Sequence, residues 1–147
     1  MRKIFLGFMC MLASSMIVKA NDVLLQGTWE VENIIVDNNT DGKIEKKTYG
    51  RNTKVQSYLP CPQKWEIKDS KTMVLYFEDD MKETVDYELK DNYLIIRYAG
   101  AIHSYRYIVN DETLSLTITQ KYKWNVGEGR VQNREEKWSI TLKKQKP

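Results

Sequence analysis

Apolar and polar residues alternate one for one over most of this chain after its first twenty residues. The segments Leu114–Thr119 and Trp138–Lys143 follow this rule without a break. Successive side chains of a β-strand point to opposite faces, so a period of two indicates strands with one buried side. We expect strands at residues 26–36, 63–68, 72–78, 83–90, 92–99, 102–109, 113–123 and 133–143.

Short polar turns separate most of these strands. Asp91-Asn92, Asn110-Asp111 and Gly127-Glu128-Gly129 are residue types that favour tight turns. About eight short strands joined in this way predict an all-β fold, an antiparallel up-and-down meander. Closure into a barrel would remove the exposed edges of such a sheet. A two-layer β-sandwich is the alternative that periodicity leaves open.

One connection is much longer than the others. Residues 37–62 are mostly polar, and we expect them to form a loop that shapes one end of the fold. Lys43–Tyr49 or Thr53–Leu59 could form a short strand or helix inside this loop.

The first twenty residues have the features of an export signal. Arg2 and Lys3 precede an apolar run, Ile4–Val18, that is too short to span a membrane. Val18-Lys19-Ala20 is an acceptable cleavage site, so we expect a protein that is exported and then periplasmic or secreted. Cleavage near Ala20 leaves residues 21–147 as a single domain.

The net charge gives no support for nucleic-acid binding. The chain has 23 Lys and Arg against 20 Asp and Glu, and three of the basic residues lie in residues 1–20. The remaining chain is formally neutral, so we expect no nucleic-acid partner. Cys61 is the only cysteine after residue 20, which excludes an intrachain disulfide there. It is expected to be a half-buried structural cysteine, with a reactive thiol as the alternative.

Candidate catalytic and metal-binding groups are scarce. His103 is the only histidine, so no cluster of histidines and cysteines can bind a metal. No serine lies in a nucleophile motif, and no glycine-rich phosphate loop is present. We therefore predict a protein that is not an enzyme and has no metal or cofactor. A weaker alternative is hydrolase or isomerase activity that uses His103.

The segment Gly27-Thr28-Trp29 opens the first expected strand, and the longest connection follows that strand. In both respects the chain resembles the lipocalins, in particular the small lipocalin-like proteins that bacteria export. The resemblance implies a calycin-type barrel in which Trp29 packs across the closed end. It also implies that a basic side chain near the last strand stacks over this indole, and Arg134 is the candidate for that role.

Tyrosine and tryptophan dominate the aromatic content, with nine Tyr and four Trp in the chain. A barrel of about eight strands can be filled by side chains or can hold one small ligand. Inward tyrosine hydroxyls with a basic group at the rim would suit an amphipathic or carboxylate-bearing molecule. The ordinary alternative is that these rings form core and surface packing. The candidate ligand-binding residues are Tyr87, Tyr98, Tyr105, Tyr107, Arg97 and His103.

These observations predict an exported, noncatalytic, monomeric lipocalin-like protein that binds a small hydrophobic or amphipathic molecule in the barrel interior. The alternative is a barrel filled by side chains that acts as a protein-interaction or inhibitor module with a partner in the cell envelope. The placement of Tyr122 and Trp124 distinguishes the two, because an exposed apolar patch at these residues would favour a protein partner.

Overall fold

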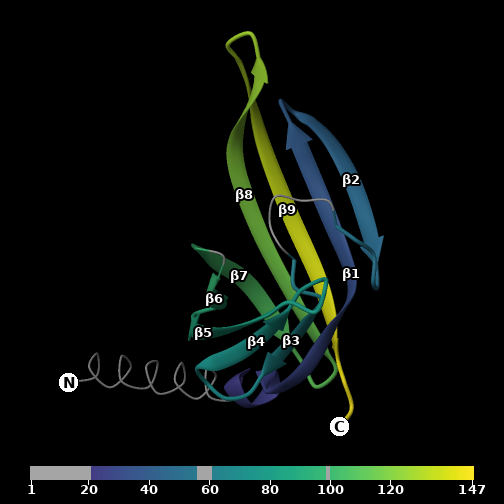
Figure 1. Cartoon of the computed structure of the whole chain (residues 1–147), viewed down its shortest axis with the longest axis vertical. Coiled ribbons are helices and arrows are strands. Elements are labelled where there is room, and N and C mark those ends of the chain that lie inside the picture. The colour runs from purple at the N-terminus through teal and green to yellow at the C-terminus, as the bar shows by residue number, and fades with distance from the viewer. Residues whose placement is uncertain (1–20, 56–60, 99) are drawn as a thin grey trace, which may run out of the picture.

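Nine antiparallel strands form one sheet in the computed structural model, which describes residues 21–55, 61–98 and 100–147. The expected signal peptide, residues 1–20, lies outside the described residues, as does part of the Thr53–Leu59 segment. The strands are β1 (Gly27–Thr40), β2 (Lys43–Gly50), β3 (Lys64–Ile67), β4 (Thr72–Tyr76), β5 (Lys82–Lys90), β6 (Tyr93–Tyr98), β7 (Ala101–Val109), β8 (Thr113–Gly127) and β9 (Arg130–Lys144) (Figure 1).

Pairing between the first and last strands closes the sheet into a barrel. β1 lies antiparallel to β9 from the pair Trp29–Lys144 to the pair Thr40–Arg134. Strands β3 to β9 follow one another as a meander, so β1 and β3–β9 form a closed ring of eight strands. The predicted antiparallel barrel is therefore confirmed, and the β-sandwich alternative is excluded because its two sheets would not be joined in this way.

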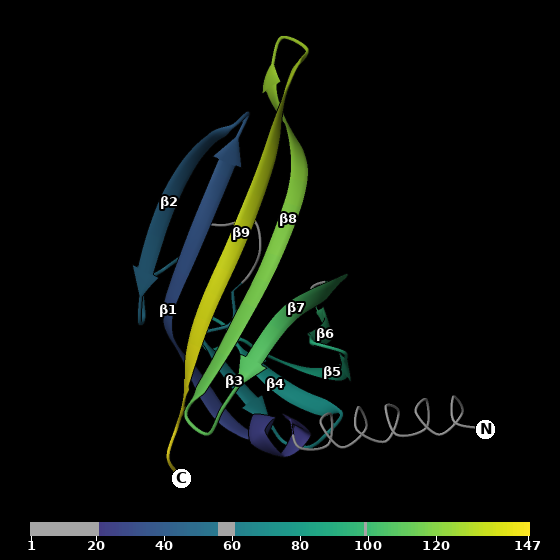
Figure 2. The same cartoon turned by 180° about the vertical axis from the view of Figure 1, so that it is seen from behind.

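β2 is the additional strand, and it lies outside the ring. β1 pairs with β3 through Gly27–Glu30 and with β2 through Asn33–Thr40, while β9 pairs with its other side from Trp29 to Thr40. A β-bulge between Val31 and Asn33 marks the change of partner. Both views show the upper parts of β1, β2, β8 and β9 rising beyond the shorter strands β3–β7 (Figures 1 and 2). We call this upper part the extended sheet.

The extended sheet corrects the expectation that residues 37–62 form a loop. Asp37–Thr40 continues β1, and β2 corresponds to the first of the two short elements considered for this region. Asp41 and Gly42 both have positive φ, at 50° and 86°, which suits a tight hairpin between two strands. The apolar alternation stops here because both faces of this part of the sheet carry polar side chains. Periodicity alone therefore could not identify the strand.

Inward-facing side chains form a continuous apolar core. Trp29 and Trp65 are the largest fully buried residues, and buried leucines on β4, β6, β8 and β9 surround them. Burial alternates strictly along β7, where every second residue from His103 to Tyr107 is buried. Burial along β7 thus follows the alternation of the sequence. In β1 the alternation from Trp29 and Val31 predicts Ile35 on the core face. The irregularity between Val31 and Asn33 turns Ile34 and Val36 inward instead.

A short helical turn at residues 21–25 and the end of β9 close the lower end of the barrel. The Trp29 indole N–H donates a hydrogen bond to the Leu25 carbonyl oxygen at 2.7 Å. Lys144 donates to the Leu24 carbonyl oxygen at 3.1 Å, and its Nζ lies 5.1 Å from the centre of the Trp29 ring. A Cβ at Gly27 would lie 2.8 Å from Lys144 Cε, and φ at this glycine is +129°. Glycine is therefore required beside the stacked lysine.

The basic residue over Trp29 is Lys144 and not Arg134. β9 runs antiparallel to β1, so its last residues lie beside the start of β1. Arg134 is opposite Thr40, at the far end of the strand pair, and its guanidinium lies over Trp124 with 5.1 Å to the ring centre. A basic side chain does lie over Trp29, and Lys144 supplies it in place of Arg134.

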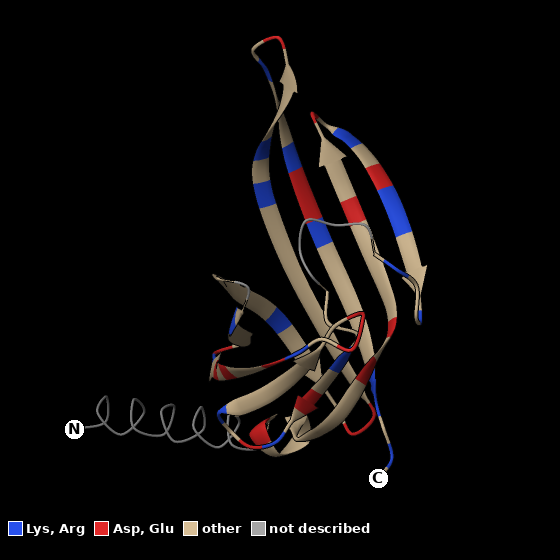
Figure 3. Ribbon diagram, in the orientation of Figure 1, with Lys and Arg blue, Asp and Glu red and all other residues tan. Residues whose placement is uncertain are grey.

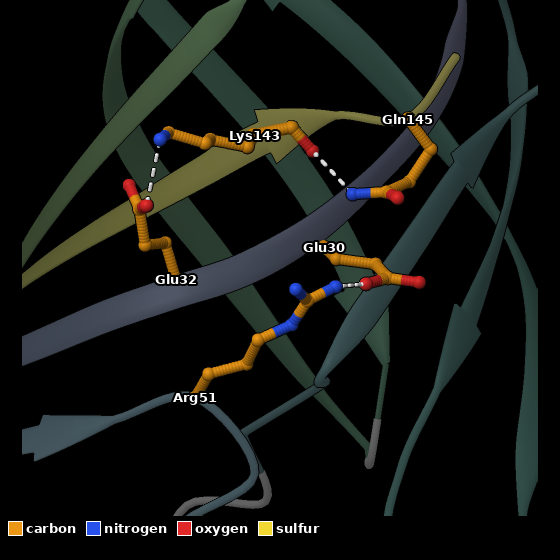
Figure 4. A network of polar contacts seen from close by, with 5 residues as sticks. All are labelled: Glu30, Glu32, Arg51, Lys143 and Gln145. Atoms are coloured by element: carbon orange, nitrogen blue, oxygen red, sulfur yellow. Dashed lines mark hydrogen bonds and ion pairs between the residues drawn. The ribbon is translucent and has the colours of Figure 1, made fainter.

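Ion pairs on the outside of the barrel hold β1 to its neighbours where its partner changes from β3 to β2 (Figure 4). Glu30 pairs with Arg51, which follows β2, and Glu32 pairs with Lys143 of β9 at 2.8 Å. Lys143 also accepts a hydrogen bond from the Gln145 side chain through its backbone oxygen, at 3.4 Å. These groups are partly exposed, so each pair contributes little to stability on its own.

Replacing Lys144 with methionine should destabilise the barrel by about 1–3 kcal/mol, because the charged hydrogen bond and the contact with the indole are lost. Lys143→Met is the matched control, since it removes only an exposed ion pair and should cost about 0–1 kcal/mol. Urea titration followed by tryptophan fluorescence measures both free energies of unfolding. Equal losses for the two variants would contradict the proposed role of Lys144.

Candidate ligand-binding region

Five of the six predicted ligand-binding residues face the interior of the barrel. The side chains of Tyr87, Tyr98, Tyr105, Tyr107 and His103 are all buried, with His103 only 3 % exposed. They come from β5, β6 and β7, at positions where the strand alternation points inward. The interior is thus lined by phenol rings as predicted, while their role in ligand binding stays a prediction.

Tyr98, His103 and Tyr105 form one cluster toward the upper end of β6 and β7. The Tyr98 and Tyr105 hydroxyls are 2.9 Å apart and share a hydrogen bond. The His103 ring stacks on Tyr98 with 4.0 Å between ring centres, and its Nε2 lies 3.3 Å from the Tyr98 carbonyl oxygen. Trp65 packs edge-on against Tyr105 at 5.6 Å. These polar groups therefore have partners within the protein.

Tyr87 and Tyr107 lie nearer the closed end and are also bound within the protein. The Tyr87 hydroxyl donates to the Asp69 carbonyl oxygen at 2.5 Å, and the Tyr107 hydroxyl accepts from the Asn21 side chain at 3.2 Å. Burial raises the pKa of both phenols. Their hydroxyls fasten the turn after β3 and the N-terminal helical turn to the barrel.

Arg97 does not line the interior. It lies between the buried residues Ile96 and Tyr98, so the strand alternation places its exposed side chain on the outside of β6. Arg97 was a candidate for the basic group at the rim of the barrel. The direction of the Arg97 side chain is set by its position in the strand alternation, which assigns it to the outer face of β6.

The inner face of the barrel continues onto the extended sheet. Along β9 the same face carries Leu142, Ile140 and Trp138, then Glu136 and Arg134. Along β8 it carries Leu116 and Ile118, then Gln120, Tyr122 and Trp124, each opposite an inner residue of β9. The residues change from fully buried and apolar to half-buried and polar within this one face.

A chain of polar contacts links these upper inner residues. The Tyr122 hydroxyl donates to Glu136 at 2.8 Å, and the Trp138 indole N–H donates to the other carboxylate oxygen at 3.1 Å. Burial and Glu136 raise the pKa of Tyr122, which the nearby Arg134 guanidinium partly opposes. Arg134 has no carboxylate within 4.0 Å among the described residues, and one of its side-chain nitrogens lies 3.4 Å from Gln132 Oε1.

Tyr122 and Trp124 do not form an exposed apolar patch. Both are half-buried on the inner face, one bonded to Glu136 and the other beneath Arg134. Sequence reasoning singled them out but could not assign their face or their partners, because these follow from the register of β8 against β9. Glu136 and Trp138 were missed as candidate site residues for the same reason.

A shallow pocket of about 460 Å³ lies near the hairpin between β1 and β2. Its lining includes Asn39, Lys121, Lys123 and Asn133, which the registers place on the outer face of the extended sheet. The Asp41 backbone N–H bonds to Asn133 and holds the hairpin against β9. Tyr122 and Arg134 of the inner face also line this pocket, so it adjoins the inner face at this end of the sheet.

Cys61 is half-buried against the core close to Tyr98 and Tyr105. Burial, with a smaller contribution from Glu78, raises the pKa of its thiol to about 12. A thiol with this pKa is almost entirely protonated at neutral pH, which favours the structural interpretation over the reactive one.

In the part of the chain that the structure describes, no group of three or more His, Cys, Asp and Glu side chains is placed to hold a metal ion. No helix in that part is long and apolar enough to cross a membrane. No protein-family model matches the sequence, and no match was found among curated proteins or solved structures.

His103 should titrate below its ordinary pKa of 6.5, because burial outweighs its hydrogen bond to Tyr98. As the pH falls below about 6.5, the unfolded chain binds a proton that the folded chain does not. The free energy of unfolding should therefore decrease toward the folded-state pKa, by up to about 1.4 kcal/mol per pH unit. Proton NMR of the single imidazole measures the pKa, and denaturation at several pH values measures the stability. A His103→Phe variant should lack this decrease above about pH 5.

Cys61 should react slowly with iodoacetamide at pH 8 in the folded protein and quickly after denaturation, because only the thiolate attacks. Mass spectrometry of the peptide that contains Cys61 separates its reaction from that of Cys10. Rapid modification in the folded state would favour the reactive-thiol interpretation.

Proposed function

We propose that this chain is an exported, noncatalytic lipocalin-like protein that binds a small amphipathic molecule at the upper end of the barrel. The ligand lies between the Tyr98–His103–Tyr105 cluster and the inner face of the extended sheet. The ligand lies above the centre of the barrel, because Trp29, Trp65 and the leucines around them already fill the lower interior.

The observation that carries this proposal is the gradient of polarity along one uninterrupted face. Ile118 and Trp138 stand opposite each other where the barrel passes into the extended sheet, and both pack against the core. The next inner residues along β9 are the carboxylate Glu136 and the guanidinium Arg134. An apolar end of a ligand fits the first pair, and a polar end fits the second.

Arg134 gives the polar end of the inner face a preference for ligands with a negatively charged group. Glu136 already accepts two hydrogen bonds, whereas Arg134 has no acidic partner among the described residues. A guanidinium held against an indole keeps its charge and loses little conformational freedom when it binds an oxyanion. Carboxylate, sulfonate and phosphate groups therefore suit this end of the face better than ammonium groups do.

Anilinonaphthalene sulfonate is a suitable probe, because it joins apolar rings to an oxyanion and fluoresces in apolar surroundings. We expect it to bind the folded full chain and to bind Arg134→Gln about tenfold more weakly, since a charged hydrogen bond is lost. Lys137→Gln is the matched control, because it removes one positive charge from the outer face of the same strand and should leave the affinity unchanged.

The apolar end is tested with the uncharged analogue N-phenylnaphthylamine. Ile118→Ala should weaken both probes by about tenfold, whereas Arg134→Gln should weaken only the sulfonate. Failure of both probes to bind the folded protein would overturn the proposed function. Binding that no inner-face variant changes would place the ligand elsewhere.

A further inference from the structure

The upper part of β8 has a strand on only one side. β8 pairs with β7 through Leu114–Thr117 only, whereas it pairs with β9 from Thr113 to Gly127. Ile118–Lys123, which we call the edge segment, has no second strand beside it among the described residues. Figures 1 and 2 agree, since β7 turns away from β8 in both views. The backbone N–H and C=O groups of the edge segment that point away from β9 are therefore available for pairing with another strand.

The two faces of the edge segment differ in chemistry. Thr119, Lys121 and Lys123 point to the outer face, where Lys137 of β9 lies opposite Thr119. Glu135 pairs with Lys121 at 3.3 Å, and Asp41 of the β1–β2 hairpin lies by Lys121 and Lys123 around the shallow pocket. The other face carries Ile118, Gln120 and Tyr122, all half-buried. A strand added here would meet positive charge on one face and a partly apolar surface on the other.

Self-association through this edge is disfavoured by the same lysines. Two copies could pair through their edge segments as antiparallel strands, with the inner faces of both copies on the same side. If residues 119–123 of the two copies overlap, Lys121 of one copy lies opposite Lys121 of the other. Like charges opposite each other destabilise a strand pair. Lysines also occupy the free edge of β2, at Lys43, Lys46 and Lys47. Figure 3 shows basic residues along both strands.

We propose that the edge segment of β8 binds an extended, acidic peptide segment of a partner protein by β-strand addition. Acidic side chains of the added strand lie opposite Lys121 and Lys123, and its alternate side chains cover Ile118 and Tyr122. Backbone hydrogen bonds hold the strand, and the lysines select its charge. β2 is the poorer edge, because its side chains before Tyr49 are all exposed and offer no half-buried apolar surface.

Two synthetic peptides test the proposal, one with glutamate alternating with valine and one with lysine alternating with valine. We expect the full chain to bind the glutamate peptide at least about tenfold more tightly, with an affinity that falls as salt is added. The change in tryptophan fluorescence reports binding. Trp124 contributes most of it, since Trp29, Trp65 and Trp138 are buried.

The double variant Lys121→Glu/Lys123→Glu should reverse the preference, so that the lysine peptide binds more tightly. The matched control, Lys46→Glu/Lys47→Glu, makes the same change on the β2 edge and should leave the preference of the wild-type protein intact. Circular dichroism establishes that both variants fold. Loss of preference in the control but not in the β8 variant would overturn the assignment to β8.

Amide hydrogen exchange distinguishes strand addition from attraction by charge alone. The glutamate peptide should slow exchange at alternate residues within Ile118–Lys123, because their backbone groups become bonded. No binding of either peptide, equal binding of both, or binding without protection of these amides would each refute the proposal. The amphipathic probes of the inner face remain an independent measurement, so the two proposals can fail separately.

Discussion

The pairing of β1 with β9 is the constraint on which the rest of the structure depends. It joins the two ends of the meander, and without it the sheet would have two long free edges. Its lower end brings Lys144 over Trp29 and so seals the base of the barrel. Its upper end continues to Thr40 and Arg134, well beyond the strands that complete the ring. One ladder of backbone hydrogen bonds therefore produces both the closed core and the open sheet above it.

The sequence predicted those parts of the fold that follow from side-chain alternation. The inward positions of Tyr105 and Tyr107 and the turn at Asp91-Asn92 are examples, because a strand buried on one face leaves a clear apolar pattern. The end of β1 was not predicted, because Asp37–Thr40 has polar groups on both faces and is held as a strand by pairing with β2 on one side and β9 on the other. Backbone pairing can extend a strand where hydrophobic burial no longer specifies it.

The candidate site was harder to predict than the fold, because it depends on register between strands. The resemblance to the lipocalins implies a basic residue near the last strand over Trp29, for which Arg134 is the candidate, yet the antiparallel direction of β9 brings Lys144 to that place. Tyr122 and Glu136 are fourteen residues apart in the chain and diagonal neighbours across the β8–β9 pair. No local pattern indicates that the two side chains are bonded. A shift of one residue in the pairing register of a strand would move each of its side chains named here to the other face of the sheet.

Unequal strand lengths explain why both proposed binding regions lie at the upper end of the molecule. β8 and β9 each have 15 residues, whereas β6 has 6 and β3 has 4. Where β8 and β9 extend beyond the shorter strands, those strands no longer cover the inner face, and β7 no longer pairs with β8. The inner face there carries half-buried polar side chains, and the edge of β8 has no second strand beside it in the part of the chain that the structure describes. Lysines on that edge oppose pairing between identical copies while leaving it open to a strand of opposite charge. The geometry that closes the core at the base thus determines where recognition can occur at the top.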